Sequence, residues 1–230
     1  LNLATINQLQ SAVDSAINDP EVRVVILRSS EKAFVAGADI LEMSNLNSVE
    51  AKSFSSKGQE LFNTIENSHK PFIASINGFA LGGGCELLLS CHIRLCSAGA
   101  KFGQPEVGLG LIAGFGGTQR LPRLIGKGVA CKMLLSGEII DSSEAFRIGL
   151  VDKIADDLDA EVDKISLKIS KNSPNAISKT LESINKGLDS NIKTGLLIER
   201  DLFAQTFEDS DSKEGMDAFI NKRKPKFKDI

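Results

Sequence analysis

The stretch "INGFALGGGCELLLSC", residues 76–91, decides how the rest of the chain is interpreted. Three consecutive glycines, Gly82 to Gly84, lead into an apolar run that contains a single carboxylate, Glu86. This order predicts a strand, a glycine turn and the N-terminus of a helix. The first N–H groups of a helix have no partner within the helix, and the helix dipole makes that end positive. Because glycine has no side chain, a carbonyl of another molecule can approach these groups closely.

Two explanations fit such a turn. In an oxyanion hole, N–H groups stabilise the negative charge of a transition state, and one donor contributes about 3 kcal/mol. Alternatively, the glycines only allow tight packing of the strand on the helix. "FVAGAD", residues 34–39, has a similar construction, because a strand that ends at Gly37 leaves the N–H of Ala38 free. Two such turns could polarise one carbonyl from two sides.

Two carboxylates accompany these turns. Glu86 lies in the first turn of the helix, and its neighbours in "CELLLSC" are typical of a buried segment. A favourable contact with the helix dipole is worth at most about 1 kcal/mol, whereas a buried acid needs partners or a function. Glu106, in "GQPEVGLGL", lies among glycines and apolar residues. Two buried acids beside an oxyanion hole predict general acid–base chemistry next to an activated carbonyl.

The segments around these turns predict an α/β core. Residues 1–19 have the apolar spacing of a helix, as do residues 48–67, for which Asn47 is the expected N-cap. Short apolar runs predict strands at 22–29, 33–37, 70–78, 93–97, 101–106 and 150–155. Short helices punctuated by glycines begin near Gly116, and nearly everything after Leu158 has helical spacing, in three or four segments. We therefore predict an α/β region over residues 1–155 and a helical region over residues 156–230.

Composition excludes several classes of protein. The net charge of −3 and the absence of Trp and Tyr argue against a nucleic-acid partner. No apolar run reaches membrane-spanning length, and no signal-peptide pattern opens the chain. The four cysteines show no metal-type pairing, which favours reduced thiols in a reducing compartment.

Motifs for nucleotides, hydrolases and metals are also absent from the sequence. The glycine spacings match neither the dinucleotide fingerprint nor the phosphate loop, and there is no G-x-S-x-G elbow. His69 and His92 have no recognisable metal-ligand partners, so a structural role is expected for each. We predict no metal site.

Four motifs together resemble the enoyl-CoA hydratase (crotonase) family. They are "KAFVAGADILEM", "KPFIASINGFALGGGCELLLSC", "KFGQPEVGLGLIAGFGGTQRLPRLIG" and "EGMDAFINKRKPKF", in this order along the chain. The resemblance implies a spiral of ββα units followed by a helical C-terminal region that forms trimers, often stacked as hexamers. Relatives also carry an N-terminal strand pair and a CoA-contacting loop ahead of the position of Leu1. Many have Pro where Ala113 stands and Asp where His92 stands, and the first difference puts the pocket shape in doubt.

The resemblance also implies roles for single residues. The N–H groups of Ala38 and Gly83 would bind the thioester oxygen of an acyl-CoA. Glu106 would give a proton to Cα while Glu86 helps to activate the water that attacks Cβ, the two acting together. The implied CoA contacts are Ala36, Gly37, Asp39, Ile40, Phe203 and Lys222, with Phe203 near the adenine and Lys222 at a phosphate.

The predicted reaction is reversible syn hydration of a trans-2-enoyl-CoA to a 3-hydroxyacyl-CoA, in fatty-acid β-oxidation or related acyl-CoA metabolism. It needs no metal or redox cofactor. Alternatives are a methylglutaconyl-CoA-type hydratase, an enoyl-CoA isomerase, or a CoA- or RNA-binding module of the same fold. Two glutamates favour hydration, because isomerases of the family often keep only one. We expect a homotrimer or homohexamer, in the cytoplasm if the source is bacterial and otherwise in the mitochondrial matrix.

Overall fold

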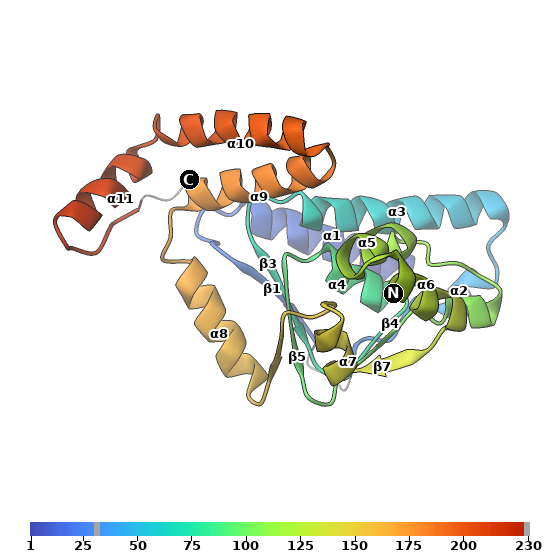
Figure 1. Ribbon diagram of the computed structural model, residues 1–230. Coiled ribbons are helices and arrows are strands. Elements are labelled where there is room, and N and C mark those ends of the chain that lie inside the picture. The colour runs from blue at the N-terminus through green and yellow to red at the C-terminus, as the bar shows by residue number, and fades with distance from the viewer. Residues whose placement is uncertain (30–32, 228–230) are drawn as a thin grey trace.

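Two four-stranded sheets form the centre of the computed structural model, which describes residues 1–29 and 33–227 (Figure 1). The first sheet has the order β1–β3–β5–β8 and is parallel throughout. The second has the order β2–β4–β6–β7 and is parallel except for the β6–β7 pair. The strands are β1 Val25–Arg28, β2 Ala33–Val35, β3 Phe72–Ile76, β4 Phe79–Leu81, β5 Ile93–Ser97, β6 Lys101–Gly103, β7 Ile139–Asp141 and β8 Lys153–Ala155.

Helices surround these sheets and make up the end of the described chain. They are α1 Leu3–Asn18, α2 Ile40–Met43, α3 Ser48–Glu66, α4 Gly83–Ser90, the 3-10 helix η1 Glu106–Leu109, α5 Gly117–Ile125, α6 Lys127–Ser136, α7 Ser142–Arg147, α8 Leu158–Ile169, α9 Pro174–Leu188, α10 Ile192–Thr206 and α11 Ser210–Ile220. Helix α3 begins with the expected capping box, because Asn47 accepts from the N–H of Glu50 while the Glu50 carboxylate accepts from the N–H of Asn47. None of the helices among the described residues is both long and apolar enough to cross a membrane.

The chain winds as a spiral between the two sheets. Each pair of successive strands, β1 with β2, β3 with β4 and β5 with β6, adds one strand to each sheet. Strand β3 lies inside the first sheet and is buried along its whole length, which explains its continuous apolar sequence. The predicted α/β fold of spiral type is confirmed by this arrangement.

Four details of the strand prediction were wrong. The strand expected over 70–78 ends at Ile76, and the chain turns at Gly78, whose φ is +68°. A separate strand, β4, then precedes the α4 helix, and the three-residue strand β7 was not predicted at all. The extended segment expected over 101–106 ends at Gly103, so that Glu106 instead begins η1.

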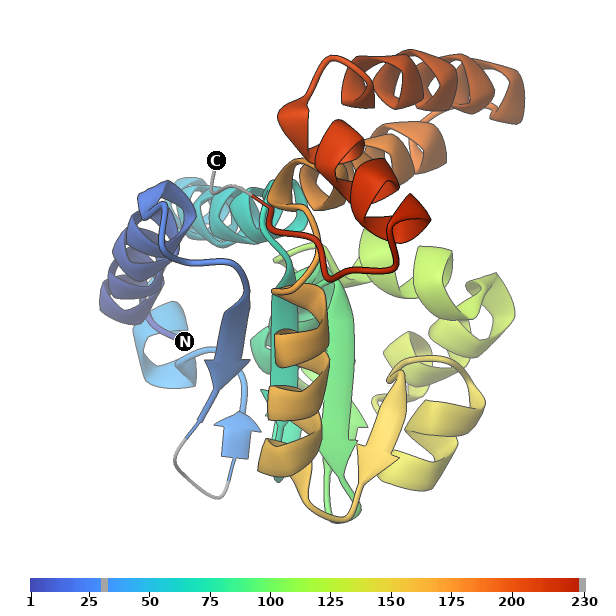
Figure 2. The same cartoon turned by 90° about the vertical axis from the view of Figure 1, so that its left-hand side faces the viewer.

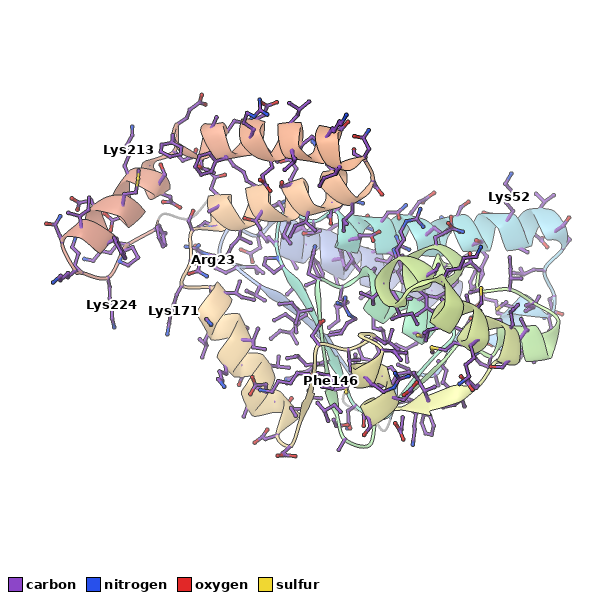
Figure 3. All side chains as sticks on the ribbon, in the orientation of Figure 1. Arg23, Lys52, Phe146, Lys171, Lys213 and Lys224 are labelled. Carbon is purple, nitrogen blue, oxygen red and sulfur yellow. The ribbon has the colours of Figure 1, made fainter. Side chains whose placement is uncertain are left out.

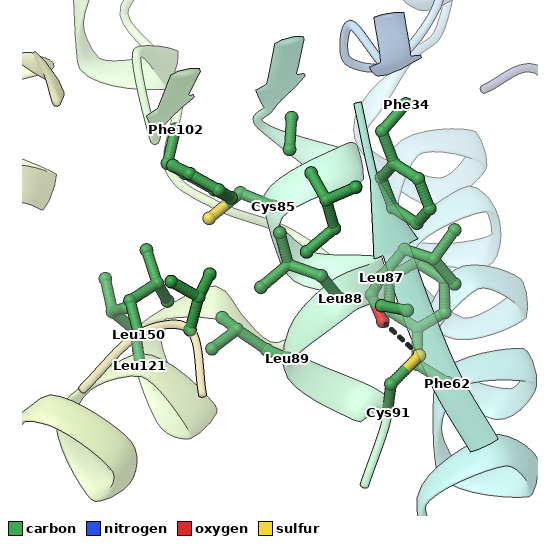
Figure 4. Packing of buried hydrophobic residues seen from close by; sticks show 14 of the residues in the cluster. Phe34, Phe62, Cys85, Leu87, Leu88, Leu89, Cys91, Phe102, Leu121 and Leu150 are labelled. Atoms are coloured by element: carbon green, nitrogen blue, oxygen red, sulfur yellow. Dashed lines mark hydrogen bonds between the residues drawn. The ribbon is translucent and has the colours of Figure 1, made fainter. Parts of the chain in front are cut away.

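Helix α4 packs at the centre of the hydrophobic core, and all eight of its residues are buried (Figure 4). Leu88 and Leu89 point toward a cluster that includes Leu121, and Leu87 lies beside Phe62. Gly84 faces strand β2, where a Cβ atom would overlap the carbonyl oxygen of Val35. The glycine triplet therefore serves tight packing at one position and is free to serve chemistry at its neighbours.

The C-terminal helices extend away from the core. Helices α9 and α10 form an antiparallel pair, α11 lies at their far end, and α8 lies against the first sheet (Figures 1 and 2). Val162 of α8 packs on Ile73 and Leu95 of that sheet. By contrast, α9 has no buried residue and α10 has one, Leu202.

Candidate active site

A cavity of about 640 Å³ opens where the β2–α2 and β4–α4 turns meet the segment 105–115. Helices α2 and α3 contribute apolar side chains to its wall. The cavity brings together seven of the residues predicted from the sequence, namely Ala36, Gly37, Ala38, Ile40, Gly83, Glu86 and Glu106.

The two glycine turns present unpaired N–H groups to this cavity. Gly82 has a φ of +50° and Gly37 a φ of +121°, conformations that favour glycine. The N–H of Gly82 donates to Gly103 O at 2.9 Å, whereas the next N–H, of Gly83, has no acceptor within the described residues. The N–H of Ala38 is likewise without an acceptor in the part of the chain that the structure describes. The turns therefore present two unpaired N–H groups to one cavity, which is the arrangement that an oxyanion hole requires.

Glu86 is fixed by two backbone N–H groups. Its side chain is 2% exposed, and Oε1 accepts from the N–H groups of Phe115 and Gly117, each at 2.7 Å. The pKa of Glu86 is raised to about 7, with burial as the largest cause and the charge of Glu106 as a smaller one, while the N–H groups of Gly117 and Phe115 and the charge of Arg120 oppose the rise. A carboxyl group with a pKa near neutrality can both give and take a proton, as general acid–base catalysis requires.

Glu106 faces the same cavity from the first residue of η1. A Cβ atom on Gly82 would lie 3.1 Å from Glu106 Oε1, so this carboxylate lies directly against the glycine turn. Burial raises its pKa. With its amide nitrogen turned toward the carboxylate, buried Gln104 donates to Oε1 at 2.8 Å and to Oε2 at 3.1 Å.

Gln104 was missed by the sequence analysis. It lies in "GQPE", a segment interpreted only as extended, and its amide gave no sign of the partner that it reaches. A polar side chain between Gly103 and Pro105 in an otherwise apolar environment was the available signal.

Three predicted CoA contacts lie outside the cavity wall. Asp39 instead caps α2, where it accepts from the N–H groups of Leu41 and Glu42. Phe203, on α10, is 64% exposed and packs edge-on against Phe207, and Lys222 follows α11. Within this chain, α10 and α11 lie at the opposite end from α2, and Lys213 and Lys224 mark that end in Figure 3.

The described residues contain no group of three or more His, Cys, Asp or Glu side chains that could hold a metal ion. His92 has the structural role that was expected, since Nδ1 accepts from the N–H of Phe72 at 2.9 Å and Nε2 lies 3.2 Å from Glu66 O. All four cysteines are free thiols, three of them buried.

Several known proteins are similar to this chain in sequence and in fold. A sequence model of the family described as "Enoyl-CoA hydratase/isomerase" matches residues 1–230. "Crotonyl-CoA hydratase" of Syntrophomonas wolfei is 47% identical over 99% of this chain and 88% of its own length, and "Short-chain-enoyl-CoA hydratase" of Clostridium acetobutylicum is 45% identical over 97% and 87%. A crystal structure of enoyl-CoA hydratase from Bacillus anthracis superposes with a TM-score of 0.95 at 38% identity, covering 99% of this chain and 90% of that one.

Proposed function

Because the chain belongs to the enoyl-CoA hydratase/isomerase family, we propose that it catalyses the reversible syn hydration of a trans-2-enoyl-CoA to a 3-hydroxyacyl-CoA. The observation that carries this proposal is the meeting of Glu86 and Glu106 in one cavity with two unpaired N–H groups. Two acids supply both proton transfers that hydration needs. The reaction belongs to fatty-acid β-oxidation or related acyl-CoA metabolism.

The N–H groups of Ala38 and Gly83 bind the thioester oxygen and stabilise the enolate-like charge that forms on it. This withdraws electrons from the double bond, so that Cβ becomes open to attack by water. The water oxygen bonds to Cβ and one of its protons passes to a carboxylate, with Glu86 orienting and activating the water. Glu106 gives a proton to Cα, and the pair returns to its starting charge after the water proton is redistributed between them. The charge of Glu106 raises the pKa of Glu86, so we treat the two acids as a coupled pair.

The reaction is redox-neutral, and the two N–H groups polarise the thioester carbonyl, the part that a Lewis-acidic metal ion plays in other enzymes. We therefore propose that it proceeds without a metal ion or a redox cofactor, CoA being part of the substrate. Turnover that is unchanged after dialysis against a chelator is the expected result.

The test is turnover of crotonyl-CoA, measured by loss of the conjugated thioester absorbance. We expect Glu86→Gln and Glu106→Gln each to lower kcat by about a thousandfold, because each removes one proton-transfer group. Glu60→Gln, on the exposed face of α3, is the matched control and is expected to keep the wild-type rate. Near wild-type turnover by either active-site variant would contradict the mechanism.

Two buried phenylalanines that line the cavity favour short acyl chains. They are Phe54 and Phe115, whose ring centroids lie 5.2 Å apart. Phe115 fits because residue 58 is glycine, where a Cβ atom would overlap the Phe115 ring. The S. wolfei and C. acetobutylicum relatives are named for crotonyl and short-chain substrates, which supports the same assignment.

Removing the Phe115 ring is expected to lengthen the acceptable chain. Phe115→Ala should raise kcat/KM for a ten-carbon enoyl-CoA relative to crotonyl-CoA by about tenfold, because it opens the buried wall. Phe62→Leu is the control, since Phe62 packs edge-on against Phe115 but does not line the cavity. An unchanged chain-length profile for Phe115→Ala would contradict the assignment.

We further propose that the protein assembles as a homotrimer or as a dimer of trimers. Large apolar side chains are exposed on the C-terminal helices, including Leu188, Ile192, Phe207 and Phe219, and in a trimer they would be covered. Phe203 and Lys222 would then contact the CoA of a neighbouring subunit rather than that of their own. Sedimentation velocity tests the assembly directly.

The buried free thiols and the bacterial relatives support a bacterial cytoplasm as the location.

A further inference from the structure

The orientation of Glu86 depends on a short loop, residues 114–117, that is distant from it in the sequence. The N–H groups of Phe115 and Gly117 converge on the single oxygen Oε1. Gly116, between them, has a φ of +113°, which turns the two donors to the same side. A shift of this loop would therefore move the carboxylate relative to the water and the substrate.

Arg120 holds this loop from outside the cavity. Its Nη1 donates to Phe115 O at 3.1 Å, so the residue whose N–H binds Glu86 is held at its carbonyl as well. The guanidinium lies so close to Gly116 that a Cβ atom there would overlap Nη1. The glycine at position 116 thus provides both the turn and the space for the arginine.

Arg120 is itself anchored on α3. Its Nε and Nη2 donate to Glu66 Oε2 at 2.9 and 2.7 Å, and Nη2 also donates to Asn63 Oδ1 at 2.6 Å. The arginine side chain is 11% exposed. The carbonyl of Glu66 accepts from Asn185 Nδ2 at 2.6 Å and lies 3.2 Å from His92 Nε2, so the end of α3 is fixed too. Only a planar guanidinium has donors in these directions at once, because a lysine ammonium is a point charge on a flexible stem.

We propose that Arg120, anchored on α3 by Glu66 and Asn63, positions the carboxylate of Glu86 by fixing the loop that donates to it. Arg120 does not line the cavity, so it acts through this loop and not on the substrate. The inference rests on the proposed hydration, because turnover is one of its readouts. The charged groups that act on Glu86 are Glu106, which raises its pKa, and Arg120, which lowers it.

The experiment compares Arg120→Met with Arg120→Lys in crotonyl-CoA hydration. Arg120→Met is expected to lower kcat about a hundredfold, with KM within about twofold of wild type, because a misplaced catalytic group lowers the rate of the chemical step. Loss of the positive charge should also move the acidic limb of the kcat–pH profile upward by about half a pH unit. Arg120→Lys keeps the positive charge but loses the planar set of N–H donors. The acidic limb of its kcat–pH profile should therefore lie at the wild-type position, while kcat is about tenfold below wild type.

Arg123→Met is the matched control. Arg123 is exposed on the same helix and donates to Gln119 O at 2.9 Å, away from the Glu86 loop, so kcat and the pH profile should not change. Thermal unfolding confirms that each variant is folded at the assay temperature. Wild-type kcat in Arg120→Met would overturn the proposal, as would full recovery of kcat in Arg120→Lys.

A crystal structure of Arg120→Met gives a readout that is independent of turnover. We expect the bond from Phe115 N to Glu86 Oε1, 2.7 Å in the native protein, to be broken or lengthened. If this bond is retained, the positioning role is wrong, and the proposed hydration is not affected by that result. If the native enzyme does not hydrate crotonyl-CoA, the proposed function fails, and the crystal structure still decides the role of Arg120.

Discussion

Helix α4 and helix α9 contrast two ways in which this chain uses apolar sequence. All eight residues of α4 are buried, including the carboxylate of Glu86, because α3, α5 and β4 surround it. Helix α9 has a pronounced apolar side but no buried residue, and Leu188 at its end is 80% exposed. The core therefore surrounds a buried acid, whereas the C-terminal helices expose an apolar surface of the kind found at subunit interfaces.

The largest effect is expected where α4 meets strand β2. Gly84→Ala should lower the free energy of unfolding by about 4 kcal/mol. The alanine Cβ atom would overlap the Val35 carbonyl oxygen, and this backbone atom lies in a densely packed core. Urea unfolding measures the change. Gly99→Ala is the control, since a Cβ atom there meets nothing within 4 Å, and a change within about 0.5 kcal/mol is expected. Equal stability of the two variants would remove the contrast between core and surface.

The next effect concerns the cost of burying Glu86. The pKa of Glu86 is raised from 4.5 to about 7, and burial is the largest cause. The carboxyl group therefore binds a proton more tightly in the folded protein than in the unfolded chain. The stability from this group is present below about pH 4.5 and is lost as the pH rises through 7. Glu86→Gln should therefore stabilise the protein by about 3 kcal/mol at pH 8, with the gain vanishing near pH 4.5. Urea unfolding at both pH values checks this, and a variant less stable than wild type at pH 8 would contradict it.

A smaller effect is expected among the C-terminal helices. Ser173 caps α9 by accepting from the N–H of Ala176 at 3.1 Å and donates to Asp211 Oδ2 of α11 at 2.7 Å. Ser173→Ala should cost about 1 to 2 kcal/mol, confined to these helices. Hydrogen exchange should show lost protection in α9 and α11 while β3 stays protected. Ser170→Ala is the control, because Ser170, the C-cap of α8, donates its hydroxyl only to the nearby Leu167 O.

The smallest change in the stability of the single chain is expected on the exposed apolar surface. Leu188→Gln and Ile192→Gln, at side chains that are 80% and 75% exposed, should change the unfolding free energy of a dissociated chain by less than about 0.5 kcal/mol. If these helices hold the assembly together, the same variants should sediment as smaller species than wild type. Unaltered assembly would place the subunit interface elsewhere.

The sequence predicted the parts of the fold that are local. The two glycine turns and both carboxylates were found because a turn, an N-cap and a buried acid each leave a mark within a few residues. Strands β4 and β7 were missed because each has three residues and no alternation long enough to detect. The ends of such strands are set by their partners in the second sheet, which the sequence does not display.

The supporting residues of the site were beyond sequence reasoning for a different reason. Gln104 reaches Glu106 only because the chain turns into η1, and Arg120 reaches Glu66 across 54 positions of sequence. Neither side chain differs in type from an ordinary surface residue. Two residues show where the family resemblance could not be checked within one chain. The resemblance predicted Phe203 and Lys222 as CoA contacts, but neither residue lines the cavity of its own chain.

The two oxygens of Glu86 are not equivalent. Oε1 holds both backbone N–H groups, while Oε2 accepts no hydrogen bond within residues 1–29 and 33–227. In the hydration that we propose, a proton taken from water would therefore bind to Oε2, and the carboxyl group cannot rotate to exchange its two oxygens without breaking both hydrogen bonds. The loop that holds one oxygen thereby makes the two oxygens of a symmetric group chemically distinct.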